Sequence, residues 1–266
     1  MPYYEIVIPF DPNISIGPLT LAWHALFSAL GIVLGYWIAR VYAPKAGVKV
    51  EDVDTIAVWC ILGGIIGARV VYVIDNWNLF SGNPLKVFEV WSGGMAVWGG
   101  ILGGISGGVI STFMARLPLP AMADLGGMGL ILGQGVGRIG DLINGEHHAL
   151  ATDLPWAFLY THPNTLATRD ATGSTFPEHP ATTYEMLFDF IIMGIMMYLM
   201  RRWGGTGRVF WVYMGLYSLG RFLVSFLRVD PFMGPLQLAQ WLGIIGMILT
   251  VAVLVPSFRK KGLAGR

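Results

Sequence analysis

The sequence predicts an all-α integral membrane protein, a bundle of about seven transmembrane helices with a small extracytoplasmic head. Hydrophobic residues make up 55% of the 266 residues, whereas charged residues make up 12%. A soluble domain usually has about 25% charged residues, so this chain has too few to cover its surface in water. Glycine is abundant, at 36 residues, as is common where transmembrane helices pack closely. Lipid is therefore the expected solvent for most of the chain.

Seven stretches are apolar enough to approach the length of about 20 residues that a spanning helix needs. They cover 19–39, 55–74, 96–115, 121–137, 185–200, 209–227 and 236–256. The segment 138–184 is the longest polar stretch, and it is too long for a plain connection in a compact bundle. We expect it to form a head inserted between the fourth and fifth spans of a single membrane domain, 1–266, with the first 18 residues and 75–95 on the same side.

Lysine and arginine are unevenly divided between the two sides of these predicted spans. Eleven lie on one side: Arg40, Lys45, Lys49, Arg116, Arg201, Arg202, Arg208, Arg259, Lys260, Lys261 and Arg266. Four lie on the other side, namely Lys86, Arg138, Arg169 and Arg228. Because cytoplasmic loops are enriched in positive residues, the C-terminus is expected in the cytoplasm. An odd number of spans then places the N-terminus and the head outside.

Glycine is patterned as well as abundant. Pairs of glycines recur at four-residue spacing over 99–108, and a similar pattern lies over 63–68. Small residues on one helix face let two backbones approach closely, so these stretches are expected to pack tightly. A flexible hinge in the third stretch is the alternative.

Three arginines, Arg69, Arg138 and Arg221, lie within or directly after apolar stretches, where a charge is costly and usually has a function. Arginine stays charged and offers a planar fork of donors that suits phosphate. Together they suggest a ligand that carries a phosphate and an apolar part. The alternative is that each arginine pairs with a carboxylate and fixes the helix packing. Four carboxylates are available: Asp141, Glu146, Glu185 and Asp189.

Other classes of site find little support. The run 133–148 does not match the phosphate loops of nucleotide-binding proteins, and neither a Gly-x-Ser-x-Gly nor a His-Glu-x-x-His motif occurs. His147 and His148 are adjacent and point in different directions, so they make a poor chelate and no metal site is predicted. The net charge of +1 gives no indication of nucleic-acid binding.

Two motifs, in this order, resemble those of the prolipoprotein diacylglyceryl transferases. The family's Gly-Arg-x-Gly-Asn-x-x-Asn-Gly-Glu is similar to Gly137 through Glu146, and its His-Pro-x-x-x-Tyr-Glu is similar to His179 through Glu185. Further matches are Ser15 to Pro18, Gly67 to Arg69 with Tyr72, Gly93 to Met95, Tyr217, Arg221 and Gln240. The resemblance extends from about residue 10 to 255 and includes the number of spans.

The resemblance implies a reaction in the cell (inner or plasma) membrane. Phosphatidylglycerol would donate its diacylglyceryl group to the lipobox cysteine that follows a prolipoprotein signal peptide, without any cofactor. Arg138 and Arg221 match the family's essential arginines and would hold the phosphate, with Glu146 as a further catalytic group. The implied lipid-binding residues are Arg138, Arg221, Arg69, Asn144, Asp141, Tyr184, Glu185, Tyr217 and Trp98.

The chain departs from the family pattern at several positions. Trp98 stands where many members have a histidine that has been proposed as the base for the thiol, and an indole cannot accept a proton usefully. His24 replaces a tyrosine, Asp141 replaces the first asparagine of the hallmark, and Ser225 replaces a glutamate. His24 and His147 are the candidate bases, and we expect His24 to act. A base is dispensable if nearby arginines let the thiol ionise unaided.

Two alternatives remain open on the sequence alone. These departures would also fit a relative that has lost its chemistry and binds anionic lipid or a membrane partner. A small anion transporter could use the same arginines, but it would be expected to show inverted repeats with paired broken helices, which the sequence lacks.

Overall fold

The computed structural model describes residues 5–17, 19–89 and 93–263, and most of them are helical. The long helices are α1 (Trp23–Tyr42), α2 (Val50–Asp75), α4 (Val97–Met114), α5 (Leu119–Asn144), α6 (Ala181–Trp203), α7 (Arg208–Ser225) and α8 (Leu238–Leu263). The short helical turns are η1 (Ala43–Ala46), α3 (Trp77–Phe80) and η2 (Pro84–Phe88). Pro18, in one of the motif matches, lies outside the described residues.

Five helices are long and apolar enough to cross a membrane: α1 with η1, α2, α4, α6 and most of α8. Large apolar side chains on them, such as Ile66 and Leu102, are well exposed, as expected where lipid is the solvent. The protein is therefore a multi-pass helical membrane protein. The other two long helices, α5 and α7, do not meet this measure of length and composition. They carry Asp124, Arg138, Asp141 and Arg221, which face other helices.

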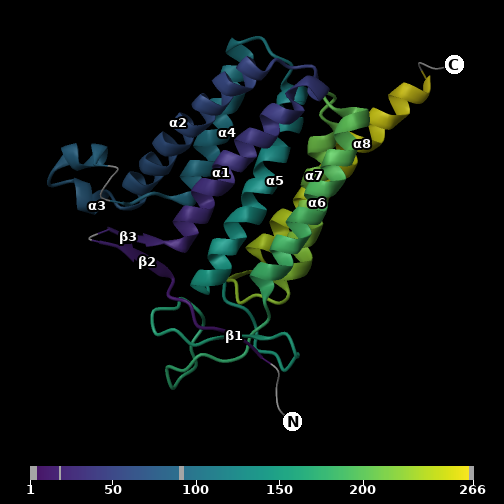
Figure 1. The fold of residues 1–266 in the computed structure, drawn as a ribbon. Coiled ribbons are helices and arrows are strands. Elements are labelled where there is room, and N and C mark those ends of the chain that lie inside the picture. The colour runs from purple at the N-terminus through teal and green to yellow at the C-terminus, as the bar shows by residue number, and fades with distance from the viewer. Residues whose placement is uncertain (1–4, 18, 90–92, 264–266) are drawn as a thin grey trace.

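The helices are arranged as closely packed pairs (Figure 1). α5 runs through the middle, with α1 on one side and α6 and α7 on the other, while α8 packs on α7 and α2 packs on α4. A Cβ at Gly103 would lie 2.1 Å from the Gly63 carbonyl oxygen, and a Cβ at Gly67 would lie 2.3 Å from that of Gly99. The predicted close packing of the glycine-rich stretches is therefore confirmed, because only glycine allows α2 and α4 to approach so closely.

Several predicted boundaries were wrong by a few residues, each for a local reason. Residues 19–22 form strand β3 (Leu19–Ala22), which pairs with β2 (Asn13–Ile16), so α1 begins only at Trp23. α5 does not end at 137 but continues to Asn144, because Arg138 and Asp141 pair with each other one turn apart. Polar residues can thus extend a helix beyond its apolar stretch.

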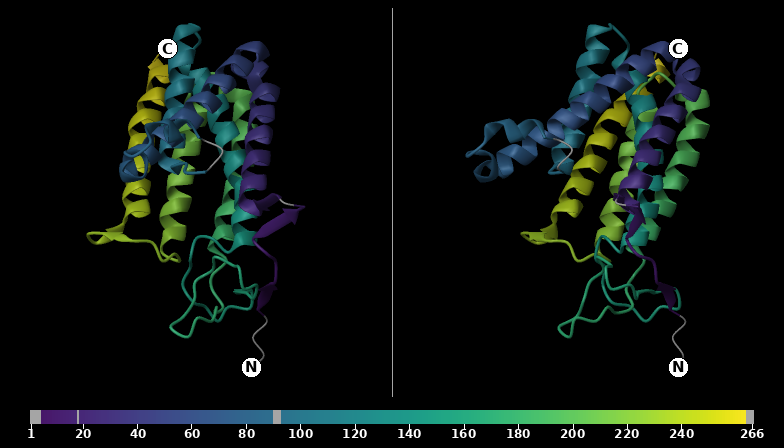
Figure 2. Two further views of the ribbon diagram at one scale, coloured as in Figure 1. Left: turned by 90° about the vertical axis from the view of Figure 1, so that its left-hand side faces the viewer. Right: turned by 60° about the vertical axis from the view of Figure 1, so that its left-hand side comes forward.

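Residues 145–180, the head segment, lie at one end of the bundle, opposite the C-terminus (Figures 1 and 2). The segment begins at 145 and not at 138, since the predicted start falls inside α5. The N-terminal strand β1 (Ile6–Ile8) runs parallel to β4 (Phe158–Tyr160), so the first residues join it as predicted. Backbone hydrogen bonds from Leu150 to Leu227 and from Val229 to His148 attach it to the end of α7. A hairpin, β5 (Phe232–Met233) and β6 (Leu236–Gln237), then leads into α8.

Candidate functional site

The polar end of α5 provides the first side chains of the site. Arg138, Asp141 and Asn144 lie in its last two turns, which end at Gly145 in the left-handed conformation typical of a helix C-terminus. Two residues later His147 also has a positive φ, of 67°, which is uncommon for a residue with a Cβ. This reversal turns the chain back, so that the His147 imidazole lies beside Asp141 on the helix it has just left.

The buried carboxylate of Glu185, in the first turns of α6, joins three helices. Its Oε2 lies 2.7 Å from Arg138 Nη2 of α5, and its Oε1 pairs with Arg221 Nη1 of α7. Arg228, just after α7, approaches the same Oε1 at 3.7 Å. Two arginines expected from the sequence therefore meet a third at a single carboxylate. Asp141 and Asp230 pair with the same arginines, so Arg138 and Arg221 have the carboxylate partners that the sequence offered as the alternative, and their guanidinium forks lie close together at one place.

Sequence reasoning missed Arg228 and Asp230 as members of this site. Asp230 accepts hydrogen bonds from Arg228 Nε at 3.0 Å and from Arg221 Nη2 at 3.5 Å. Burial opposes its ionisation, but the hydrogen bonds and charge of Arg228 outweigh it and lower the pKa of Asp230 below its ordinary value. Arg228 Nη1 is buried and donates no hydrogen bond within the described residues. The signal available was that Arg228 is one of few basic residues on its side of the predicted spans.

Asp141 connects α1 to this centre. Its Oδ1 lies 2.5 Å from His24 Nδ1 in the first turn of α1, and its Oδ2 lies 3.0 Å from Arg138 Nη1. Oδ2 is also 3.1 Å from His147 Nε2, whose Nδ1 is 3.1 Å from Arg228 Nη2. The candidate bases His24 and His147 thus lie on opposite oxygens of one buried carboxylate.

Asn144 and Glu146 complete this part of the site. The Asn144 side-chain amide donates to Glu146 Oε1 at 2.8 Å, while its own Oδ1 is buried without a hydrogen bond in the described chain. Glu146 Oε2 lies 3.9 Å from His24 Nδ1. One donor atom each of His24, Asp141 and Glu146 lies within 4.8 Å of the other two, so these three could approach a cation, although no metal site was predicted.

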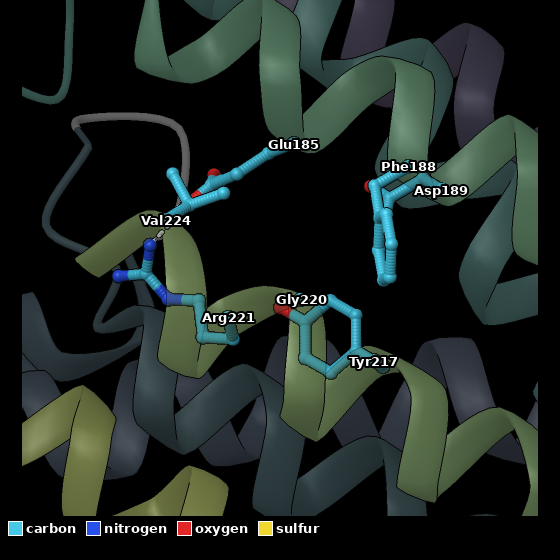
Figure 3. Close-up of a pocket in the computed structure, with 7 residues that line it drawn as sticks. All are labelled: Glu185, Phe188, Asp189, Tyr217, Gly220, Arg221 and Val224. Carbon is cyan, nitrogen blue, oxygen red and sulfur yellow. Dashed lines mark hydrogen bonds and ion pairs between the residues drawn. The ribbon is translucent and has the colours of Figure 1, made fainter. Parts of the chain in front are cut away.

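Two hollows adjoin the arginines. A narrow cleft of about 10 Å³, roughly the room of one water molecule, lies between α6 and α7. Figure 3 shows Glu185 and Arg221 on one side of it and Phe188 with Asp189 on the other, so charged and aromatic side chains both line the cleft. A larger cavity of about 500 Å³ opens towards the head segment. Its lining residues are Glu146, His147, His148, Leu166, Arg228, Val229 and Asp230.

Arg69 does not join this site, although the sequence grouped it with Arg138 and Arg221. Its guanidinium donates to five backbone carbonyls, those of Lys86, Val87, Glu89, Gly93 and Gly94. A guanidinium has five N–H groups, so the full set is used in holding the segment between α2 and α4. This arginine anchors a loop.

Three further residues that the sequence predicted for the site, Tyr217, Tyr184 and Trp98, lie in different places relative to Glu185 and its arginines. Tyr217 lines the narrow cleft beside Arg221. Tyr184 lies at the base of the head segment, where its hydroxyl accepts a hydrogen bond of 2.7 Å from Trp156 Nε1. Trp98 lies in the first turn of α4 with 60% of its surface exposed. It has no described contact with Arg138, Arg221 and Arg228, which form the arginine cluster. Trp98 thus has no partner among the polar residues of the site.

Comparison with known proteins identifies the family of this chain. The family model for prolipoprotein diacylglyceryl transferase matches residues 12–256. A relative from Clostridioides difficile (strain 630), named phosphatidylglycerol--prolipoprotein diacylglyceryl transferase, is 36% identical over 86% of this chain and 88% of its own length. Relatives of the same name from Trichormus variabilis and Staphylococcus aureus (strain Newman) are 32% and 30% identical, over 93% and 91% of this chain and 89% and 86% of theirs. The chain therefore belongs to the prolipoprotein diacylglyceryl transferase family.

Proposed function

We propose that this protein transfers the diacylglyceryl group of phosphatidylglycerol to the thiol of the lipobox cysteine of a prolipoprotein. The single observation that carries the proposal is the meeting of Arg138, Arg221 and Arg228 at Glu185, next to the larger cavity. Relatives of the protein are named phosphatidylglycerol--prolipoprotein diacylglyceryl transferase, after this activity. The product is a thioether, and glycerol phosphate leaves.

The arginines would hold the phosphate of the lipid. The buried Arg228 Nη1 is available as a donor, and Arg138 and Arg221 can turn towards a phosphate because Glu185 already holds them close together. The glycerol phosphate head would occupy the larger cavity, which Arg228 lines together with Glu146 and His147. The diacylglyceryl part would contact the apolar side chains that line the narrow cleft, Phe188 and Val224.

The chemical step is a displacement at a glyceryl carbon. A new C–S bond forms while the C–O bond to the phosphate breaks, and the leaving oxygen gains negative charge. Guanidinium groups already directed at that charge would stabilise the transition state. Glu146 would orient Asn144 and the head group, Tyr217 and Tyr184 would border the lipid, and His24 would take the thiol proton. No step requires a cofactor.

The topology completes the proposal. We place all seven long helices across a cell membrane, the inner or plasma membrane, with α5 and α7 crossing because their charges pair inside the bundle. The uneven distribution of lysine and arginine supports a cytoplasmic C-terminus and an N-terminus and head segment outside. The arginine cluster would then face the outer leaflet, where both membrane-tethered substrates can reach it.

The test is turnover by purified protein in detergent with phosphatidylglycerol and a lipobox peptide, followed by mass spectrometry of the thioether. Arg138→Lys and Arg221→Lys keep the charge but lose the planar fork, and each should lower turnover by about 100-fold or more. Arg40→Lys is the matched control, since Arg40 pairs with Asp54 at the far end of α1. No thioether from folded wild-type protein would favour a lipid-binding relative without chemistry.

A further inference from the structure

Two histidines contact Asp141, and the hydrogen bonds show that they differ in their capacity to accept a proton. His147 Nδ1 lies 3.1 Å from Arg228 Nη2. A guanidinium can only donate, so this nitrogen must be the acceptor. The proton of a neutral His147 ring is then on Nε2, which donates to Asp141 Oδ2 at 3.1 Å. Both ring nitrogens of His147 are occupied, and neither has a free lone pair.

His24 has the opposite arrangement. Its Nδ1 lies 2.5 Å from Asp141 Oδ1, and an ionised carboxylate can only accept, so Nδ1 carries the proton. The lone pair of the neutral ring is therefore on Nε2, which makes no hydrogen bond within the described chain. The side chain of His24 is 45% exposed, so a substrate group can reach it.

Close backbone contact between α1 and α5 holds His24 and Asp141 together. A Cβ at Gly140 would lie 2.6 Å from His24 Cα, so α5 and α1 are in direct contact at this turn. Asp141 is 4% exposed, and its second oxygen is bound by Arg138 and His147. The carboxylate therefore has little freedom to turn away from His24.

We propose that Asp141 is a positioning residue that fixes the His24 imidazole with its Nε2 lone pair free, so that His24 and not His147 takes the thiol proton. This rests on the proposed transferase function. The two residues are 117 positions apart in the sequence, and the fold brings them into direct contact.

The proton transfers balance without a further reactant. The thiol proton moves to His24 Nε2, the thiolate sulfur forms the C–S bond, and the C–O bond to the phosphate breaks. The imidazolium then returns the proton to the released phosphate monoester, whose second pKa is about 6, or to water. Three charged groups surround the imidazolium: Asp141 and Glu146 favour it, while Arg138, paired to the same Asp141, opposes it.

The experiment is the dependence of kcat on pH, with a lipobox peptide and phosphatidylglycerol. Wild-type activity should rise with pH as the imidazolium loses its proton and should then become constant. His24→Gln should remove that rise and leave a rate that follows the ionisation of the thiol, near pH 8.5, with a loss of about 100-fold near pH 7. His147→Gln should keep the imidazole-dependent rise, whatever its absolute rate.

Asp141→Asn tests the positioning role, because an amide has only one acceptor oxygen and cannot accept at once from His24 Nδ1 and from Arg138 and His147 on the other side. It should lower kcat at least tenfold and leave the KM for phosphatidylglycerol unchanged, and Asp141→Glu should restore part of the rate. His162→Gln is the control, since His162 pairs with Asp11 in the head region. A thermal midpoint for each variant establishes that it is folded.

Three results would overturn the proposal: a wild-type pH profile in His24→Gln, loss of the rise in His147→Gln, or a change of KM alone in Asp141→Asn. Activity that a chelator abolishes and zinc restores would also overturn it, by making His24, Asp141 and Glu146 metal ligands. The proposed function fails separately, if folded wild-type protein forms no thioether at any pH, including values at which the thiol is fully ionised.

Discussion

Gly140 of α5 lies against the backbone of His24 in α1, so closely that the smallest side chain would not fit between them. A Cβ there would be 2.6 Å from His24 Cα and 2.9 Å from the carbonyl oxygen of Trp23. Neither atom belongs to a flexible side chain, so Gly140→Ala must push the two helices apart. We expect the variant to lose at least tenfold in kcat, measured as thioether formation, because His24 moves away from Asp141.

A glycine in the same helix provides the control for this effect. A Cβ at Gly126 meets nothing within 4 Å. Gly126→Ala should therefore keep wild-type activity and gain slightly in stability, since alanine favours helices. Equal losses in both variants would mean that any methyl group added to α5 lowers the activity, and that the contact with His24 does not determine the result.

Glu185→Gln should destabilise the bundle. The substitution keeps the size of the side chain but leaves Arg138 and Arg221 without their shared buried charge, and breaking a buried ion pair in this way costs about 3–5 kcal/mol. The measurement is the thermal midpoint in detergent. Asp54→Asn is the matched control, because it breaks the more exposed pair with Arg40, which is worth about 1 kcal/mol or less. Similar midpoints for the two variants would contradict the central role of Glu185.

Arg69→Lys should loosen a loop without weakening lipid binding. An ammonium has three donors in place of five, so at least two of the five carbonyls, those of Lys86, Val87, Glu89, Gly93 and Gly94, lose their bond to this side chain. We expect faster proteolytic cleavage between α2 and α4 and an unchanged KM for phosphatidylglycerol. Lys86→Ala, which removes an exposed side chain from the same loop, should be cleaved at the wild-type rate. An increased KM for phosphatidylglycerol in stable Arg69→Lys protein would show that Arg69 takes part in lipid binding.

The head segment should lose stability as the pH rises, because it contains a buried glutamate, Glu178. Burial raises the pKa of Glu178 from 4.5 to about 7. The folded state then binds a proton that the unfolded state has released between these values, so the stabilisation is complete below pH 4.5 and lost by about pH 7. Thermal midpoints of wild type and Glu178→Gln should diverge over this range, with the variant less sensitive to pH. Parallel curves would show that Glu178 is already ionised in the folded protein.

The sequence could predict the helical bundle and the two central arginines, because both follow from local rules. Apolar stretches indicate helices wherever they occur, and a cation inside such a stretch needs a partner. The same rule, however, treated Arg69 and Arg221 alike. Their difference depends on the backbone carbonyls of Lys86, Val87 and Gly93, which accept from Arg69 and which no residue type reveals.

The remaining parts of the site depend on contacts between distant residues. His24 and Asp141 are 117 positions apart, and each one alone was only a departure from a pattern. From the sequence, Arg228 served only as one of the basic residues that indicate the membrane orientation. Its place beside Glu185 depends on backbone hydrogen bonds between residues 148–150 and 227–229. The end of α5 was predicted too early because hydropathy cannot show that Arg138 and Asp141 neutralise each other one turn apart.

The position of Glu185 in α6 also affects the order in which the site can assemble while the chain is being synthesised. Synthesis proceeds from the N-terminus, so Arg138 and Asp141 leave the ribosome before Glu185, Arg221 and Arg228 have been translated. During that interval His24, already made in α1, is the partner that Asp141 can find, and the glycine contact between α1 and α5 can bring the two together. The contact between α1 and α5 would thus be the first part of the site to assemble, and the three arginines would meet at Glu185 only after α7 has been added.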